Sequence, residues 1–210
     1  MKTSIALKAL LGAASMALPL VTFAESNVQS GGGTLTATAH VDFSIVIPQI
    51  LYLRVGTGSS YTTGALSSNP AIDLITFSPT AAQVGSGAAI TGTGGDITGS
   101  TDTAAIVSNF GNVTLIATAT GALGDGAGDS IPFTQITTTA TSNTFATTLQ
   151  APTLANGTSN TITLNAPATK VIQADAKWAF SYANTTTPPA GTYGGVNVNN
   201  SRVVYTASMP

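Results

Sequence analysis

The chain contains no cysteine and very few charged residues of either sign. Of its 210 residues, six are lysine or arginine, eight are aspartate or glutamate and one is histidine. The absence of cysteine excludes a disulfide framework and thiol chemistry. The four basic residues beyond Lys2 and Lys8 are scattered along the chain, so they cannot form the clustered basic patch that nucleic acid or an anionic membrane surface requires.

Long apolar runs are also scarce, and the longest lies near the N-terminus. Lys2 and Lys8 are followed by the apolar residues 9–21 and by the small-residue sequence TFA at 22–24. This pattern predicts a cleaved signal peptide over residues 1–24, with an apolar core too short to remain as a membrane span. We therefore expect an exported mature chain that begins at Glu25 and passes through the periplasm to the cell surface or the medium, without a membrane span.

Threonine, alanine, glycine, serine and asparagine dominate the rest, threaded with short apolar alternations. The strongest alternation covers residues 35–47, where an apolar residue stands at every odd position. A period of two is typical of a strand with one buried face. At ~3.3 Å per residue the run would be ~40 Å long, well beyond a usual strand of about 5–6 residues. The run therefore either bends or has two halves with different roles, and two consecutive core strands, this run and residues 50–55, are the preferred interpretation.

Further short apolar segments, separated by glycine-rich and asparagine-rich turns, also predict strands. They cover residues 50–55, 71–77, 104–107, 113–119, 131–134, 161–164, 177–182 and 202–207. Residues 168–176 are the one stretch where a helix competes, because Pro167 could occupy its first position. This spacing predicts an all-β protein, a single immunoglobulin-like or jelly-roll-like β-sandwich over residues 34–210, after a flexible arm at 25–33.

The aromatic residues near the C-terminus form the clearest candidate core. Trp178, Phe180 and Tyr182 share one face of a predicted strand, and Tyr205 lies on the last one. The predicted core contains Leu35, Val41, Phe43, Ile45, Leu53, Leu115, Trp178, Phe180 and Tyr205. The alternative is an exposed aromatic platform for sugar rings, to which Tyr52, Tyr61 and Tyr193 could contribute.

Two groups of residues are candidates for chemistry. His40, Asp42 and Ser44 fall on one face of the first run, but no nucleophile elbow or oxyanion site accompanies them, so a polar outer face is the preferred interpretation. Residues 124–129 (GDGAGD) have the composition of a calcium loop, but the single copy and its spacing favour a solvated turn around Asp125 and Asp129. We expect no catalytic residues, no metal and no cofactor, and therefore no enzyme.

The two ends of the mature chain carry a family resemblance. Residues 189–193 (PAGTY), followed by residues 196–198 and a last strand at 202–206, resemble the ending of bacterial chaperone–usher pilins and spore-coat-U-like secreted subunits. The leader, the polar arm and the alternating first run are similar to the beginning of such proteins. The resemblance implies an incomplete immunoglobulin-like sandwich that assembles by strand donation, with a periplasmic chaperone and an outer-membrane usher as partners.

Composition and resemblance together favour a structural role. We expect an exported subunit of a cell-surface fibre, pilus or adhesive coat, which self-associates into a polymer by β-strand complementation. The strand offered to the neighbour is predicted to present Leu35, Ala37, Ala39 and Val41, while Phe43 and Ile45 serve the subunit's own sheet. The alternative is a monomeric secreted carbohydrate-binding or adhesin domain.

Overall fold

A computed structural model describes residues 26–58 and 66–210 of the chain. The predicted signal peptide, the expected new N-terminus at Glu25 and the candidate sugar contact Tyr61 lie outside the described residues. The chain divides into two units at the junction of Ile47 and Pro48. The second unit contains all the strands assigned in the described residues.

The strands of the second unit are short and follow one another with turns between them. They are β1 (Leu51–Val55), β2 (Ile90–Thr91), β3 (Thr101–Ser108), β4 (Val113–Ala119), β5 (Leu123–Gly124), β6 (Ser130–Ile131), β7 (Ile136–Thr141), β8 (Thr147–Thr148), β9 (Ile162–Leu164), β10 (Ile172–Tyr182) and β11 (Val203–Ser208). A single 3₁₀ turn, Phe133–Gln135, precedes β7 within the described part.

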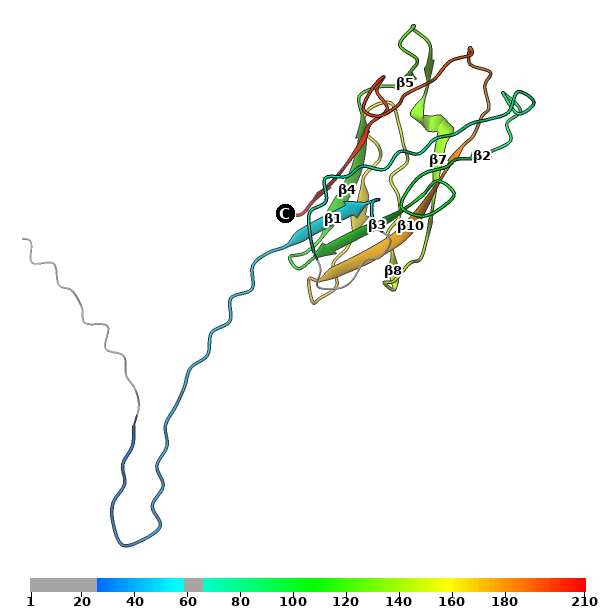
Figure 1. Cartoon of the computed structure of the whole chain (residues 1–210). Helices are drawn as coiled ribbons and strands as arrows, with labels where there is room; N and C mark the ends of the chain where they lie inside the picture. The colour runs from blue at the N-terminus through cyan, green and yellow to red at the C-terminus, as the bar shows by residue number, and fades with distance from the viewer. Residues whose placement is uncertain (1–25, 59–65) are drawn as a thin grey trace, which may run out of the picture. The chain divides into compact units, whose positions relative to one another are not determined.

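Most of these strands form two sheets that pack face to face (Figure 1). The larger sheet has the order β1-β3-β10-β2, and β7 and β8 also pair with β10. The smaller sheet has the order β11-β4-β9, and β5 and β6 form a separate short hairpin. All of the strand pairs are antiparallel except β8 with β10. The prediction of an all-β sandwich is confirmed.

The core lies between the two sheets and is built from alternate residues. Strand β10 contributes Trp178 and Phe180 from the larger sheet, and β4 contributes Leu115 from the smaller one. The Trp178 ring is fully buried, its centroid lies 5.3 Å from that of Tyr205, and its indole N–H donates a 2.8 Å hydrogen bond to the carbonyl of Leu149. Trp178, Phe180 and Leu115 are therefore core residues as predicted, whereas Tyr205 and Leu53 are half-buried at its margin.

The prediction for the first alternating run needs correction. Residues 26–47 form no strand, and the side chains of Phe43 and Ile45 are 90% and 86% exposed instead of lying in the core. The compact sandwich thus begins at Pro48 and not at residue 34. Alternation makes a segment capable of pairing, but a strand exists only where another strand supplies hydrogen bonds, and none of the described strands pairs with this run.

The sandwich also differs from the sequence-based prediction at three places. Residues 168–176 hold no helix, because β10 begins at Ile172 and pairs with β3 from Ile172 to Ala179. Residues 71–77 contain only an isolated bridge from Thr76 to Thr93. Strand β7, with the sequence ITTTAT, lies outside the strands that the sequence predicts. Pairing with a distant strand outweighs local preference in β7 and in β10, whereas residues 71–77 have a strand-like pattern but join no sheet.

Candidate functional site

The first candidate surface is residues 34–47, the alternating run that follows the polar segment 25–33. These residues are called the N-terminal arm from here on. Leu35, Ala37, Ala39 and Val41, the predicted assembly residues, are all exposed, and so are Phe43, Ile45 and Ile47 on the same alternation. Soluble proteins seldom leave a contiguous row of apolar side chains in water, and such a row marks an interaction site. The arm is therefore the strongest candidate for an interaction in the described residues.

The candidate catalytic trio lies on the same arm. His40, Asp42 and Ser44 are exposed and occupy the even positions, opposite the apolar row. Catalytic groups depend on an enclosed setting that orients them and excludes water. The arm provides no such enclosure within the described unit, and the trio marks its polar face.

The edges of the sandwich form the second candidate surface, and its two long sides differ. On one side β1, the end of the larger sheet, packs against β11, the end of the smaller sheet. On the other side β9 ends the smaller sheet, and a groove separates it from β8 and the start of β10. One lateral seam of the sandwich is thus closed, and the other is open.

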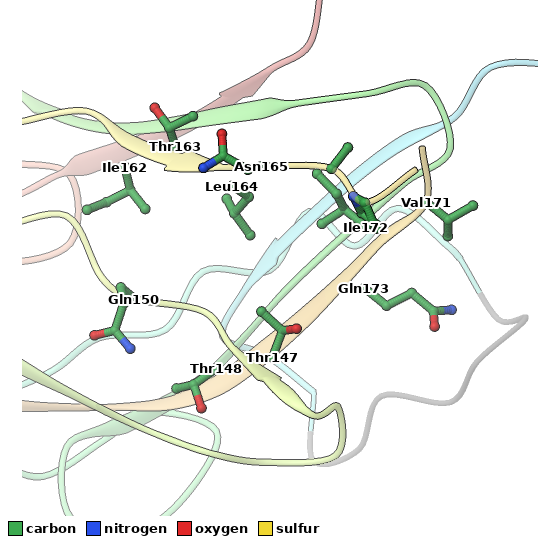
Figure 2. Close-up of a pocket in the computed structure, with 12 residues that line it drawn as sticks. Thr147, Thr148, Gln150, Ile162, Thr163, Leu164, Asn165, Val171, Ile172 and Gln173 are labelled. Carbon is green, nitrogen blue, oxygen red and sulfur yellow. The ribbon is translucent and has the colours of Figure 1, made fainter. Parts of the chain in front are cut away.

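The groove at the open seam has a volume of about 610 Å³. Figure 2 shows Ile162 and Leu164 of β9 on one wall and Thr147 and Thr148 of β8 on the other. Ile162 and Leu164 are half-buried and pack against the main core. The lining contains no ionisable side chain and consists of Thr147, Thr148, Gln150, Ile162, Thr163, Leu164, Asn165, Ala166, Pro167, Val171, Ile172 and Gln173.

The aromatic stripe does not form a sugar platform. Trp178, Phe180 and Tyr182 are all buried, and the ring of Tyr182 lies 6.2 Å from that of Phe77 inside the unit. A stacking platform must present ring faces to solvent. The carbohydrate-binding alternative therefore loses the residues that motivated it, and retains only Tyr52 and Tyr193 among the described ones.

The glycine-rich loop at 124–129 is a turn held by one carboxylate. The Asp125 Oδ1 atom accepts hydrogen bonds from the backbone N–H groups of Ala127, Gly128 and Asp129 at 2.8–3.0 Å. These bonds, the one from Ala127 first, lower the pKa of Asp125. Gly126 and Gly128 have φ values of 82° and 119°, which only glycine adopts readily. In the part of the chain that the structure describes, no group of three acidic, histidine or cysteine residues could hold a metal ion.

An acidic cluster that the sequence did not indicate lies beside the end of β1. Asp73, Asp96 and Asp102 come from three separate segments, and their carboxylates organise the nearby loops. Asp96 accepts the N–H of Thr103 at 2.8 Å and that of Gly58 at 3.0 Å, and Asp73 accepts the N–H of Thr57. The sequence shows only that these three aspartates are present. It does not reveal that they lie close together, because they are far apart along the chain.

Asp102 is the unusual member of this cluster. Its side chain is buried, and burial raises its pKa to about 6, with the negative charges of Asp73 and Asp96 adding to the effect. Gly56, with a φ of 75°, lies directly against the carboxylates of Asp73 and Asp102, so a side chain there would collide with both. Asp102 can therefore take up a proton near pH 6.

The PAGTY sequence forms a tyrosine-closed turn. The hydroxyl of Tyr193 donates a 2.8 Å hydrogen bond to the carbonyl of Pro189, four residues upstream. Similar Tyr-to-backbone closures occur at corners of immunoglobulin-like sandwiches, although this geometry alone fixes no family. The PAGTY sequence thus has a local structural role, which is to fix the loop before β11.

The described residues include no helix with the length and apolar character that a membrane crossing requires. Comparison with known proteins gave no match to a family model, to a curated protein or to a solved structure.

Proposed function

We propose that this protein is an exported structural subunit of a cell-surface fibre, pilus or adhesive coat, and that its N-terminal arm joins one subunit to the next by β-strand complementation. The observation that carries the proposal is the arm's row of exposed apolar side chains at alternate positions. An extended segment of this kind becomes stable when it adds to the edge of another sheet, where main-chain hydrogen bonds supply affinity and alternate side chains supply specificity.

The correction at Phe43 and Ile45 enlarges the donated segment. The sequence pattern predicts that these residues anchor the run in its own sandwich, but both are exposed. The whole odd-numbered face from Leu35 to Ile47 is thus available to a partner. A subunit that donates through one surface and accepts through another makes a head-to-tail contact, which gives an open filament when the rotation does not close.

Export supports the same function. The sequence of residues 1–24 favours a cleaved signal peptide, and the PAGTY ending resembles those of secreted pilins. The absence of cysteine and the low charge suit a repetitive extracellular subunit that needs neither redox chemistry nor an electrostatic partner. A periplasmic chaperone and an outer-membrane usher are the partners that the resemblance implies.

The test compares Ala39→Asp with Thr38→Asp in the exported chain. Ala39 lies on the apolar face, so its replacement places an unpaired charge in the partner at a cost of several kcal/mol. Thr38 lies on the opposite face and serves as the matched control. We expect Ala39→Asp to abolish fibres seen by electron microscopy while the melting temperature of the monomer stays unchanged. Equal fibre yield from Ala39→Asp and the natural chain would contradict strand donation.

A further inference from the structure

We propose that strand β7 is a second interaction surface, at which two copies of this chain pair edge to edge around a two-fold axis. The larger sheets of the two copies then continue into one another, and no segment leaves its own sandwich. The contact uses a different surface from the N-terminal arm, so it does not depend on strand donation. Added to a head-to-tail fibre, it joins neighbouring fibres side by side into ribbons.

Strand β7 is an edge of the larger sheet. It pairs with β10 over all six of its residues, Ile136–Thr141, and with no other described strand (Figure 1). Its side chains alternate between half-buried and exposed, and the exposed ones are all threonine, at positions 137, 139 and 141. The outer side of β7 is therefore a place where another strand can be added.

The hydrogen bonds show which residues of β7 face this open side. The N–H of Ala183 donates to the carbonyl of Gln135, just before β7, so the odd-numbered residues of this ladder bond to β10. In an antiparallel pair, successive residues direct their N–H and C=O groups to opposite sides of the strand. The main-chain groups that point away from the sheet are therefore those of Ile136, Thr138 and Ala140.

The usual protection of a sheet edge is missing at β7. Natural edges are guarded by charged side chains, prolines or bulges. The sequence ITTTAT has no charge and no proline, and its register opposite β10 is unbroken. Residues 130–169, which surround it, contain no ionisable side chain at all. By contrast, the edge strand β1 carries Arg54, and β11 follows Arg202 and packs against β1.

The outward groups of β7 are complementary to themselves. With a two-fold axis at Thr138, this residue lies opposite its own copy, and Ile136 lies opposite Ala140 of the second copy. Each such antiparallel pair exchanges two bonds, so the contact gains about six main-chain hydrogen bonds. On the outer face Thr137 meets Thr139 of the second copy. The same patch serves both copies, as a two-fold contact requires.

The side chain of Thr138 is the second observation that points to a partner. Its Oγ1 atom is buried and has no hydrogen-bond partner among the described residues. Buried hydroxyl groups without a partner are uncommon in folded proteins. Threonines that lie opposite each other across an antiparallel pair can join their hydroxyl groups by a hydrogen bond. Pairing at the two-fold axis thus supplies Thr138 with the partner that it lacks in a single copy.

The first test measures association through β7 alone. The exported Ala39→Asp chain is used, because strand donation by the arm is disabled in it. We expect reversible dimers in sedimentation experiments between about 1 µM and about 1 mM, the range of weak and transient contacts. A chain that stays monomeric throughout this range would overturn the inference.

A charge exchange in the same chain locates the contact. Thr137→Lys combined with Thr139→Lys places like charges opposite each other on an exposed face, and should weaken the dimer at least about tenfold. The two corresponding glutamate substitutions should do the same. A mixture of the lysine and glutamate chains should associate again, because opposite charges then face each other. A mixture that stays monomeric would contradict pairing at β7.

The matched control is Thr206→Lys combined with Ser208→Lys. These two residues are also exposed hydroxyl residues two positions apart on a strand, but they lie on β11. The pair adds the same charge to the chain, and we expect the dimer to be unchanged. A loss equal to that of the β7 pair would mean that net charge, and not the β7 edge, governs association.

Disulfide trapping tests the register, because the chain has no cysteine of its own. In the proposed pairing, Thr137→Cys of one copy and Thr139→Cys of another have Cβ atoms about 4.5–5.5 Å apart, whereas two Thr137→Cys copies lie diagonally, about 7–8 Å apart. The mixture of the two chains should therefore yield at least about tenfold more linked dimer than either chain alone. Equal yields would overturn the two-fold axis at Thr138.

The outcomes separate this contact from strand donation. With Ala39 intact, electron microscopy should show ribbons for the natural chain and single fibres for the chain with lysine at 137 and 139. Fibres that stay joined side by side in that lysine chain would overturn the β7 contact alone. Dimers of the Ala39→Asp chain, with no fibres from the natural chain, would contradict strand donation alone.

Discussion

At the residue scale, burial separates the side chains that stabilise the fold from those that remain exposed and can contact another molecule. Phe180 and Phe43 share the same chemistry and both stand on an apolar alternation, yet Phe180 lies in the core and Phe43 is exposed. The difference comes from their neighbours, because β10 pairs with β3 on one side and with β7 on the other. Strand β10 is thus central, and its inner face is covered by the smaller sheet.

This contrast predicts different effects for one substitution at two positions. Phe180→Ala should lower the free energy of unfolding by about 3–5 kcal/mol, because it removes a buried ring and leaves a cavity. Phe43→Ala should change it by less than about 0.5 kcal/mol, since its ring contributes little to the subunit's own core. Chemical denaturation of the monomeric chain measures both. A large loss for Phe43→Ala would mean that the arm packs into its own sandwich.

Asp102 gives the protein a pH-dependent stability. The folded pKa of about 6 lies above the ordinary value of 3.8, so the folded chain binds the proton more tightly than the unfolded chain. The corresponding stability is fully present below about pH 4 and is lost as the pH rises through 6. Allowing for partial solvent screening, we expect the free energy of unfolding to fall by about 1–2 kcal/mol between about pH 4 and pH 7.

Asp102→Asn should remove this dependence. The amide oxygen can still accept the N–H of Asp96, which donates to Asp102 Oδ1 at 3.1 Å, but the side chain no longer titrates. Thermal melts from pH 4 to pH 7 measure the slope, and Asp42→Asn on the exposed arm is the control. An unchanged slope in Asp102→Asn would mean that Asp102 is not the source of the pH dependence.

At the element scale, the arm and the strands differ in whether a neighbouring strand forms main-chain hydrogen bonds with them. Strand β4 alternates buried and half-buried residues from Val113 to Ala119, with β11 on one side and β9 on the other. The arm has a similar alternation of apolar and polar residues, but the described strands leave it unpaired. Pattern alone thus predicts a capacity for strand formation, and a partner converts that capacity into a strand.

Limited proteolysis should therefore find the arm first. In monomeric protein we expect chymotrypsin to cut after Phe43 about tenfold faster than at any site in β4 or β10, where cleavage requires the sandwich to open. In assembled protein the same site should be protected, because an added strand does not fit a protease active site. Mass spectrometry identifies the fragments. A first cut within β10 would contradict the division of the chain at Ile47.

A buried carboxylate of β10 holds the loop between β7 and β8 in place. Asp175 in β10 is fully buried, and its carboxylate accepts hydrogen bonds from the N–H groups of Thr144 and Phe145 and from the side chain of Asn143. These bonds hold the connection from β7 to β8 against β10. They also fix the position of β8, which forms one wall of the groove.

At the scale of the whole molecule, the sandwich has one closed seam and one open seam. Strands β1 and β11 pack together on one side, while β8 and β9 are separated by the groove on the other. A sandwich that is open on one side, together with an N-terminal arm that pairs with none of the described strands, is the combination that the proposed assembly uses. This combination, more than any single residue, is the basis of the proposed function.

The sequence by itself determined the fold class and much of the core. Alternation at 113–119 and 177–182 predicted β4 and most of β10, and the spacing of Trp178, Phe180 and Tyr182 placed all three on one buried face. These features follow from a local period of two, which the side chains themselves encode. The absence of cysteine also excluded thiol chemistry, because the chain lacks the residue type on which that chemistry depends.

Tertiary structure alone decided which alternating segments found partners. It paired none of the described strands with residues 34–47, it converted residues 172–176 into the start of a central strand, and it paired the threonine-rich β7 with β10. It also brought Asp73, Asp96 and Asp102 together and opened the groove beside β9. Strand pairing joins residues far apart in the chain, so its outcome depends on competition among all the edges of the fold, which no local pattern contains.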